Sequence, residues 1–113
     1  MSPAAIQAFK AAFFRALAHP IRIRILETLG EGERSVHELQ SALALDQPVV
    51  SQQLAVLRAK NIVTSRKVGT TVRYALSDPL ITRLLAVARE IFDNHLVDSQ
   101  SMLKELQREA RKS

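Results

Sequence analysis

Apolar residues recur at helical spacing through the first half of the chain. The pattern predicts four amphipathic helices, over residues 4–18, over residues 20–29, after the cap Ser35, and from the cap Asp46 to Lys60. The positions expected on the buried faces of the last three are Ile21, Ile25, Leu29, Val36, Leu39, Leu43, Val50, Leu54 and Leu57. Four helices of this kind indicate one aliphatic core.

The period of the pattern then falls to two. Residues 62–67 and 71–76 are rich in Val, Thr, Arg and Tyr and flank Gly69, which is typical of a hairpin with a short tip. Asp78 and Pro79 form the start signal of a last helix, which we expect to run to about residue 108. We expect the polar end beyond it, at residues 110–113, to fray.

The order of the elements indicates the fold class. A mostly helical chain with one small β-hairpin, in the order α-α-α-α-β-β-α, is a winged helix-turn-helix, and residues 1–113 are expected to form one such domain. A last helix of roughly 28 residues spans ~40 Å, which is more than a small domain can cover. We therefore expect part of its apolar stripe to pack against a second copy of the chain.

Charge and composition narrow the function. The net charge is +5, which favours a polyanionic partner, and the absence of cysteine excludes disulfides and thiolate metal sites. No signal peptide and no membrane-length apolar run is present, so a cytoplasmic protein that does not contact a membrane is the simplest expectation. The chain has no Gly-rich phosphate loop and no catalytic motif, so we do not expect an enzyme.

The fourth helix carries a polar face near its start, where a recognition helix reaches base edges in the major groove. Its candidate contacts to double-stranded DNA are Gln47, Val49, Ser51, Gln52 and Gln53, with Arg58 near the far end as a phosphate contact. Glutamine bonds adenine through two hydrogen bonds, so half-sites that contain A·T pairs are a hypothesis. A solvated helix face is the alternative for these glutamines.

The hairpin carries the second group of DNA candidates. We expect phosphate contacts, with minor-groove contacts as a further hypothesis, from Arg66, Lys67, Thr70, Thr71 and Arg73. A solvated face is the alternative for the basic residues of this group.

Two stretches carry a family resemblance. ALAHPIRIRILETL (16–29) and SVHELQSALALDQPVVSQQLAVLRAKNIVTSRKVGTTVRYAL (35–76) resemble the second helix, and the helix-turn-helix and wing, of the ArsR/SmtB family of metal- and stress-responsive repressors. The resemblance implies a transcriptional regulator, most often a repressor, that binds an operator as a homodimer through its first and last helices. In this chain the apolar residues on those helices are Ile6, Phe9, Phe13, Ile81, Leu85, Ala88, Phe92 and Leu96.

The chain departs from the metal sites of that family. Ser35 and His37 stand where the third-helix sensors carry Cys-x-Cys, so a thiolate site is absent. In the last-helix zinc site only the first ligand, Asp78, is matched, because Leu80, Ile91 and Asn94 occupy the other positions.

His95 and Asp98 are the remaining metal candidates. They lie three residues apart, so one helix face presents both, and with ligands from a partner subunit they form a hypothetical site for Ni²⁺ or Zn²⁺. A solvated or interface histidine is the alternative. Two further hypotheses stay open for the whole chain: a metal-independent regulator controlled by a regulatory protein partner or another ligand, and a dimeric helical interaction module that does not read DNA.

Overall fold

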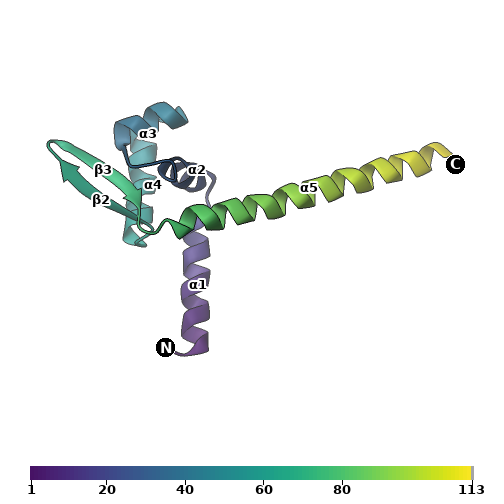
Figure 1. Cartoon of the computed structure of the whole chain (residues 1–113), viewed down its shortest axis with the longest axis horizontal. Helices are drawn as coiled ribbons and strands as arrows, with labels where there is room; N and C mark the ends of the chain where they lie inside the picture. The colour runs from purple at the N-terminus through teal and green to yellow at the C-terminus, as the bar shows by residue number, and fades with distance from the viewer. Residues whose placement is uncertain (113) are drawn as a thin grey trace. The chain divides into compact units, whose positions relative to one another are not determined.

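The computed structural model describes residues 1–112, apart from the side chain of Val97. Helices and strands follow in the predicted order, with one short strand added (Figure 1). The elements are α1 (Pro3–Leu17), α2 (Pro20–Leu29), β1 (Arg34–Ser35), α3 (Val36–Leu43), α4 (Gln47–Ala59), β2 (Val63–Val68), β3 (Thr71–Leu76) and α5 (Leu80–Lys112). The chain divides into two compact units, of which the first is Met1–Thr82 and the second begins at Arg83.

The helix starts follow the expected capping chemistry, with one difference. Ser35 and Glu38 form the predicted capping box at the start of α3, where each side chain accepts a hydrogen bond from the other residue's backbone N–H at 3.1 Å. Asp46 is the N-cap of α4, as predicted, but its side chain makes no capping hydrogen bond. The start of α4 therefore depends on Pro48 and on packing rather than on a side-chain cap.

The predicted hairpin belongs to a three-stranded antiparallel sheet with the order β1-β3-β2. β1 pairs Arg34 with Tyr74 and Ser35 with Arg73. A two-residue strand has no detectable alternation of its own, which is why the sequence pattern does not reveal it. At the other end, the pairing of Val68 with Thr71 leaves a two-residue loop that begins at Gly69.

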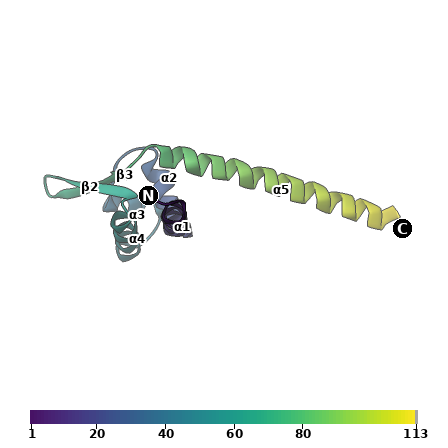
Figure 2. The same ribbon diagram turned by 90° about the horizontal axis from the view of Figure 1, so that it is seen from below.

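Gly69 fits this tight loop because its φ is +63°, a region where residues with a Cβ are strained. Thr70 is not among the described residues with positive φ, as expected for a type II′ hairpin with glycine in the first loop position. Figures 1 and 2 show the hairpin extending away from α2, α3 and α4. Most of its side chains are consequently open to solvent.

The core lies between α2, α3, α4 and the base of the sheet. The predicted core of α4 is confirmed, because Val50, Leu54 and Leu57 are completely buried there. Ile21 and Val36, which were predicted on the buried faces of α2 and α3, are half-buried. This packing fixes one face of α4 inside the domain and leaves the opposite face outside.

The last helix differs from its prediction at both ends. Fraying was expected at residues 110–113, of which Ser113 lies outside the described residues; α5 continues to Lys112, because the segment from Lys104 onward contains strong helix formers and no Gly or Pro to end it. At the start of the helix, Ile81 is only 6% exposed and belongs to the core of its own chain. It is therefore unlike the other residues expected at a dimer interface. No helix within residues 1–112 combines the length and apolarity that a membrane span requires.

Candidate DNA-binding surface

The polar face of α4 is held outward by the three buried residues on its opposite side. Val50, Leu54 and Leu57 are each 0% exposed, so rotation of the helix about its axis would bury polar side chains. The predicted reading residues Gln47 and Gln52 are exposed, while Val49, Ser51 and Gln53 are half-buried. The exposed polar residues begin at the first residue of the helix, where a recognition helix contacts base edges.

The predicted reading residues differ in how free their side chains are. Gln47 Nε2 donates a hydrogen bond to Ser51 Oγ at 2.8 Å, so these two residues form a pair on the helix surface. Gln53 Oε1 accepts a hydrogen bond from Arg22 Nη1 at 3.0 Å, which ties it to α2. Gln52 has no side-chain partner among the described residues. Among the predicted glutamines it is the one most available to a base.

Arg22 and Arg24, both on α2, donate hydrogen bonds to the C-terminal ends of neighbouring helices. Arg22 Nε donates to the carbonyl oxygen of Ala16 at 2.7 Å, at the end of α1, and Arg24 Nη2 donates to that of Leu43 at 2.8 Å, at the end of α3. Cationic donors at helix C-termini satisfy carbonyl groups that have no partner within the helix. The two arginines therefore have a structural role within the domain.

Two arginines of the hairpin meet at one carboxylate. Arg66 and Arg73 lie directly opposite each other on β2 and β3. Two like charges in this position repel each other and destabilise the strand pair. Glu33 removes the conflict: its Oε2 accepts from Arg66 Nε at 3.0 Å, and its Oε1 accepts from Arg73 Nε at 2.9 Å and lies 3.0 Å from Arg66 Nη2. We call Glu33, Glu38, Arg66 and Arg73 the wing clamp.

Glu38 completes the wing clamp from α3. Its Oε1 accepts a hydrogen bond from Arg73 Nη1 at 2.8 Å, while Arg73 Nη2 donates to the carbonyl oxygen of Glu33 at 3.1 Å. The hydrogen bond from Arg66, together with that from Arg73 and the charge of both, lowers the pKa of Glu33 below its ordinary 4.5. The backbone N–H of Ser35, followed by Arg73, lowers the pKa of Glu38, and the bond to Glu38 raises the pKa of Arg73.

The wing clamp engages Arg73 within its own chain, so its contact with DNA stays a prediction. This residue was expected to contact DNA, but its side chain is 28% exposed and its guanidinium bonds to two carboxylates and a carbonyl of its own chain. Arg66 is 67% exposed and keeps one side open beyond its ion pair with Glu33. Glu33 and Glu38 are the participants that sequence reasoning missed, because their approach to the hairpin depends on the unpredicted strand β1.

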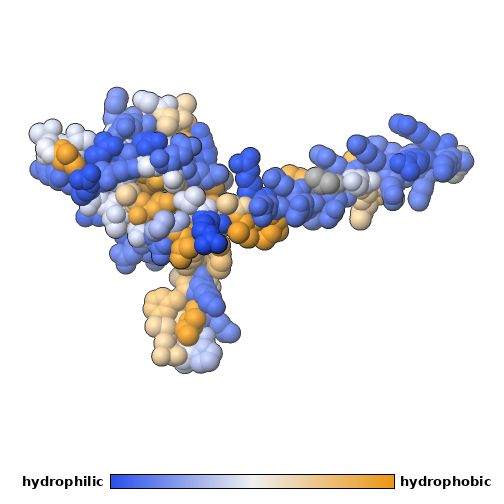
Figure 3. Space-filling model, in the orientation of Figure 1, coloured by the Kyte–Doolittle hydropathy of each residue, from blue (hydrophilic) through white to orange (hydrophobic). Residues whose placement is uncertain are grey.

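The remaining wing candidates are exposed. Lys67, Thr70 and Thr71 are open to solvent and have no side-chain partner within the described part of the chain. Figure 3 shows a largely hydrophilic surface over the hairpin. Arg58, on α4, is likewise exposed. One wing lysine and two threonines are therefore free to contact a phosphate backbone.

Apart from Ile81, which is buried in its own chain, the predicted dimer residues are either exposed or half-buried. Ile6 and Phe9 on α1, and Phe92 and Leu96 on α5, are large apolar side chains that are 41–64% exposed. The half-buried members are Phe13, Leu85 and Ala88. Figure 3 shows apolar surface along α1. Exposed apolar residues in such numbers are typical of a surface that another chain covers.

The metal candidates do not make a complete site in one chain. His95 and Asp98 are both exposed on α5, and no cluster of three or more His, Cys, Asp or Glu residues able to hold a metal exists in the part of the chain described. Zinc in proteins takes at least three protein ligands. The residues of one chain therefore do not fit Ni²⁺ or Zn²⁺ unaided.

A buried core behind a polar reading helix, followed by a basic hairpin, defines a winged helix-turn-helix DNA-binding regulator. Residues 19–65 match the family described as "Bacterial regulatory protein, arsR family". The chain is 47% identical over 98 residues, or 86% of each protein, to the uncharacterized HTH-type transcriptional regulator Rv0081 of Mycobacterium tuberculosis. It belongs to the ArsR family, as the resemblance indicates, and is a DNA-binding transcriptional regulator.

Solved structures agree in fold. The crystal structure of Rv0081 superposes with a TM-score of 0.76 at 45% identity, covering 88% of this chain and 98% of that one. The homodimeric winged helix-turn-helix DNA-binding domain of Mb0332 from Mycobacterium bovis gives 0.75 at 31% identity, covering 85% and 91%. A biofilm growth-associated repressor of Agrobacterium fabrum is 40% identical over 82 residues, which are 73% of this chain and 70% of the repressor.

Proposed function

We propose that the protein is a repressor that binds an inverted-repeat operator as a homodimer, with one α4 in the major groove of each half-site. The observation that carries the proposal is the polar start of α4, where Gln52 is exposed without a partner among the described residues and the opposite face is fully buried. Two such helices related by a twofold axis read half-sites about one DNA turn apart, ~34 Å. The similarity to the biofilm growth-associated repressor of Agrobacterium fabrum supports repression rather than activation.

The homodimer is supported by the exposed apolar residues of α1 and α5. Each copy alone would leave Phe9 and Phe92, each 64% exposed, in water. The relative described as homodimeric has the same fold. Burial of apolar surface stabilises an assembly by about 25 cal/mol per Å², so covering several such side chains favours association.

The wing contributes charge rather than sequence discrimination in this proposal. Lys67 is the wing cation without an internal partner in residues 1–112, and the neighbouring Arg66 keeps part of its guanidinium open to solvent. Contacts to phosphate position a protein on DNA without reading bases. Specificity is therefore assigned to α4.

A selection from random double-stranded DNA tests the function. We expect the purified full-length protein to enrich an inverted repeat with half-site centres about 10 base pairs apart. Enrichment of single half-sites would contradict the dimeric mode. No enrichment, together with no salt-sensitive binding to the upstream DNA of its own gene, would overturn the proposed operator binding and leave a helical interaction module.

A response to nickel or zinc is a second hypothesis, carried by His95 and Asp98 on one face of α5. It requires ligands from a second copy, because one chain offers two. Calorimetric titration with Ni²⁺ and Zn²⁺, on the wild type and on His95→Ala, decides between this hypothesis and control by a partner protein or another ligand. Equal heats for the two proteins would remove His95 from any metal site.

A further inference from the structure

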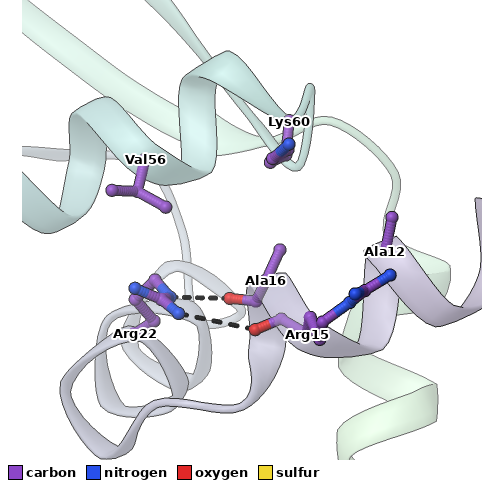
Figure 4. Close-up of a pocket in the computed structure, with 6 residues that line it drawn as sticks. All are labelled: Ala12, Arg15, Ala16, Arg22, Val56 and Lys60. Carbon is purple, nitrogen blue, oxygen red and sulfur yellow. Dashed lines mark hydrogen bonds between the residues drawn. The ribbon is translucent and has the colours of Figure 1, made fainter.

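Arg22 connects α4, the reading helix, to the end of α1. Its Nε donates a hydrogen bond to the carbonyl oxygen of Ala16 at 2.7 Å, and its Nη2 donates to that of Arg15 at 3.4 Å (Figure 4). The third nitrogen, Nη1, donates to Gln53 Oε1 at 3.0 Å. Because two of its nitrogens are bonded to backbone carbonyl groups, the guanidinium is held in place and presents Nη1 to Gln53 in one orientation.

This bond determines which atom of the Gln53 amide remains available. A guanidinium has only N–H donors, so the oxygen of a side-chain amide is the one atom that bonds to it. The amide nitrogen, Nε2, is therefore turned away from Arg22, and it bonds to no other residue within residues 1–112. No buried side-chain nitrogen or oxygen lacks a partner in this part of the chain, so the unbonded Nε2 lies where solvent reaches it.

Gln53 lies on the same row of α4 as Val49. The two residues are four positions apart within the first two turns of the helix, so their side chains are neighbours on one face. Both were predicted to contact bases, and in the proposed function this part of α4 lies in the major groove. The base contact of Gln53 therefore rests on the proposed function, whereas its bond to Arg22 does not.

The bond to Arg22 changes the base that suits Gln53. A free glutamine pairs with adenine, because its oxygen accepts from N6–H₂ while its nitrogen donates to N7. The oxygen of Gln53 already accepts from a cation, which repels a further N–H donor. Guanine presents two acceptors, O6 and N7, along the same edge. We propose that Gln53 reads guanine through its N–H₂ group and that Arg22 is the positioning residue that sets this preference.

Gln52 provides a comparison within the same helix. It is exposed and has no side-chain partner among the described residues, so its amide turns freely and fits adenine. Two adjacent glutamines of identical chemistry thus read different bases, because Arg22 bonds to one of them. A half-site read by both contains a guanine and an adenine.

Selection from random double-stranded DNA, with the full-length wild type and its variants, tests the assignment. Gln53→Glu keeps an acceptor for Arg22 but has no N–H₂ group, so the guanine at one position of each half-site should no longer be enriched. Its affinity for the wild-type operator should fall about fivefold or more. Arg22→Met frees the oxygen of Gln53, so the preference at the same position should change from guanine to adenine.

Arg24→Met is the matched control, because it also removes a bond from α2 to the end of a helix but leaves Gln53 untouched. It should keep the guanine. The bond itself is measured without DNA, by NMR of the side-chain N–H₂ group of Gln53. We expect its chemical shift to move in Arg22→Met and to stay at the wild-type value in Arg24→Met.

Three results would overturn the proposal. They are adenine enriched by the wild type at the position that Gln53→Glu changes, guanine retained by Gln53→Glu, and guanine retained by a folded Arg22→Met. If Arg22→Met does not fold, the wild type and Gln53→Glu decide the matter without it. Failure of the wild type to enrich any operator would refute the proposed function, and the base assignment with it, before any variant is compared.

Discussion

Helix α4 and the β2–β3 hairpin both present residues to DNA in the proposed binding mode, yet they are held in place by different forces. On α4, Val50, Leu54 and Leu57 are completely buried. In β2 only Val63 is buried, and the hairpin is fixed from the side by the wing clamp, whose members stay partly exposed. The reading helix is thus placed by apolar packing, and the wing by charge.

This difference gives the two regions different sensitivities. Salt screens the attraction between exposed charges, with a Debye length of about 8 Å at physiological salt. Contacts between buried apolar side chains carry no charge for salt to screen. Salt and acid should therefore loosen the wing before they disturb α4. Variants that weaken one region and leave the other unchanged test whether α4 and the hairpin are held by these different forces.

Removal of a buried leucine from α4 should have the largest effect, on the stability of the whole domain. Leu54→Ala deletes a side chain that is 0% exposed and leaves a cavity, so we expect a loss of about 2–5 kcal/mol in the free energy of unfolding. Arg58→Ala, an exposed position on the same helix, should stay within about 0.5 kcal/mol. Denaturant unfolding monitored by circular dichroism measures both. Equal losses for the two variants would remove the assigned role of the buried face.

Loss of the free glutamine should come next. Gln52→Ala is expected to cost about 1–3 kcal/mol of discrimination between the selected operator and random DNA, because the side-chain amide no longer bonds a base edge. Gln107→Ala, on the exposed surface of α5, serves as the control. Fluorescence anisotropy with labelled duplexes measures the ratio of affinities. An unchanged ratio of affinities would mean that Gln52 does not contact a base and is part of a solvated helix face.

Loss of the free wing lysine should affect the salt dependence and leave sequence discrimination intact. Lys67→Ala is expected to reduce the slope of log affinity against log salt by about 0.9 for each phosphate that the lysine neutralises, on operator and random DNA alike. Lys104→Ala, which removes the same charge from α5, is the control for net charge. A slope that stays at the wild-type value would place Lys67 away from the DNA backbone.

Acid should weaken the wing clamp, with a smaller effect on the whole domain. The pKa of Glu33 and of Glu38 is lowered in the folded protein, so their stabilising contribution is present above the ordinary value of 4.5 and is lost as the pH falls through the folded pKa values. In thermal unfolding, the wild type should therefore melt above Glu33→Gln at pH 7, and the gap should close toward pH 3. A gap of constant size would show that the carboxylate charge of Glu33 is not what stabilises the hairpin.

The contrast also explains what could be predicted from the sequence. Helix α4 and its core were predictable because apolar spacing is local, so Leu54 and Leu57 are recognisable without the rest of the fold. The wing clamp was not, because Glu33 and Arg73 lie forty residues apart and meet only through a two-residue strand. For the same reason Arg73 is indistinguishable, in sequence alone, from a free basic residue such as Lys67.

In the proposed binding mode, α4 reads the DNA sequence and the wing supplies positive charge. The most direct test of this division of roles is the salt dependence of affinity for operator and for random DNA, measured in parallel for wild type, Gln52→Ala and Lys67→Ala. We expect Gln52→Ala to lower the specificity ratio and keep the slope, whereas Lys67→Ala keeps the ratio and lowers the slope. The reverse assignment, or a decrease of both quantities in both variants, would contradict the division of roles.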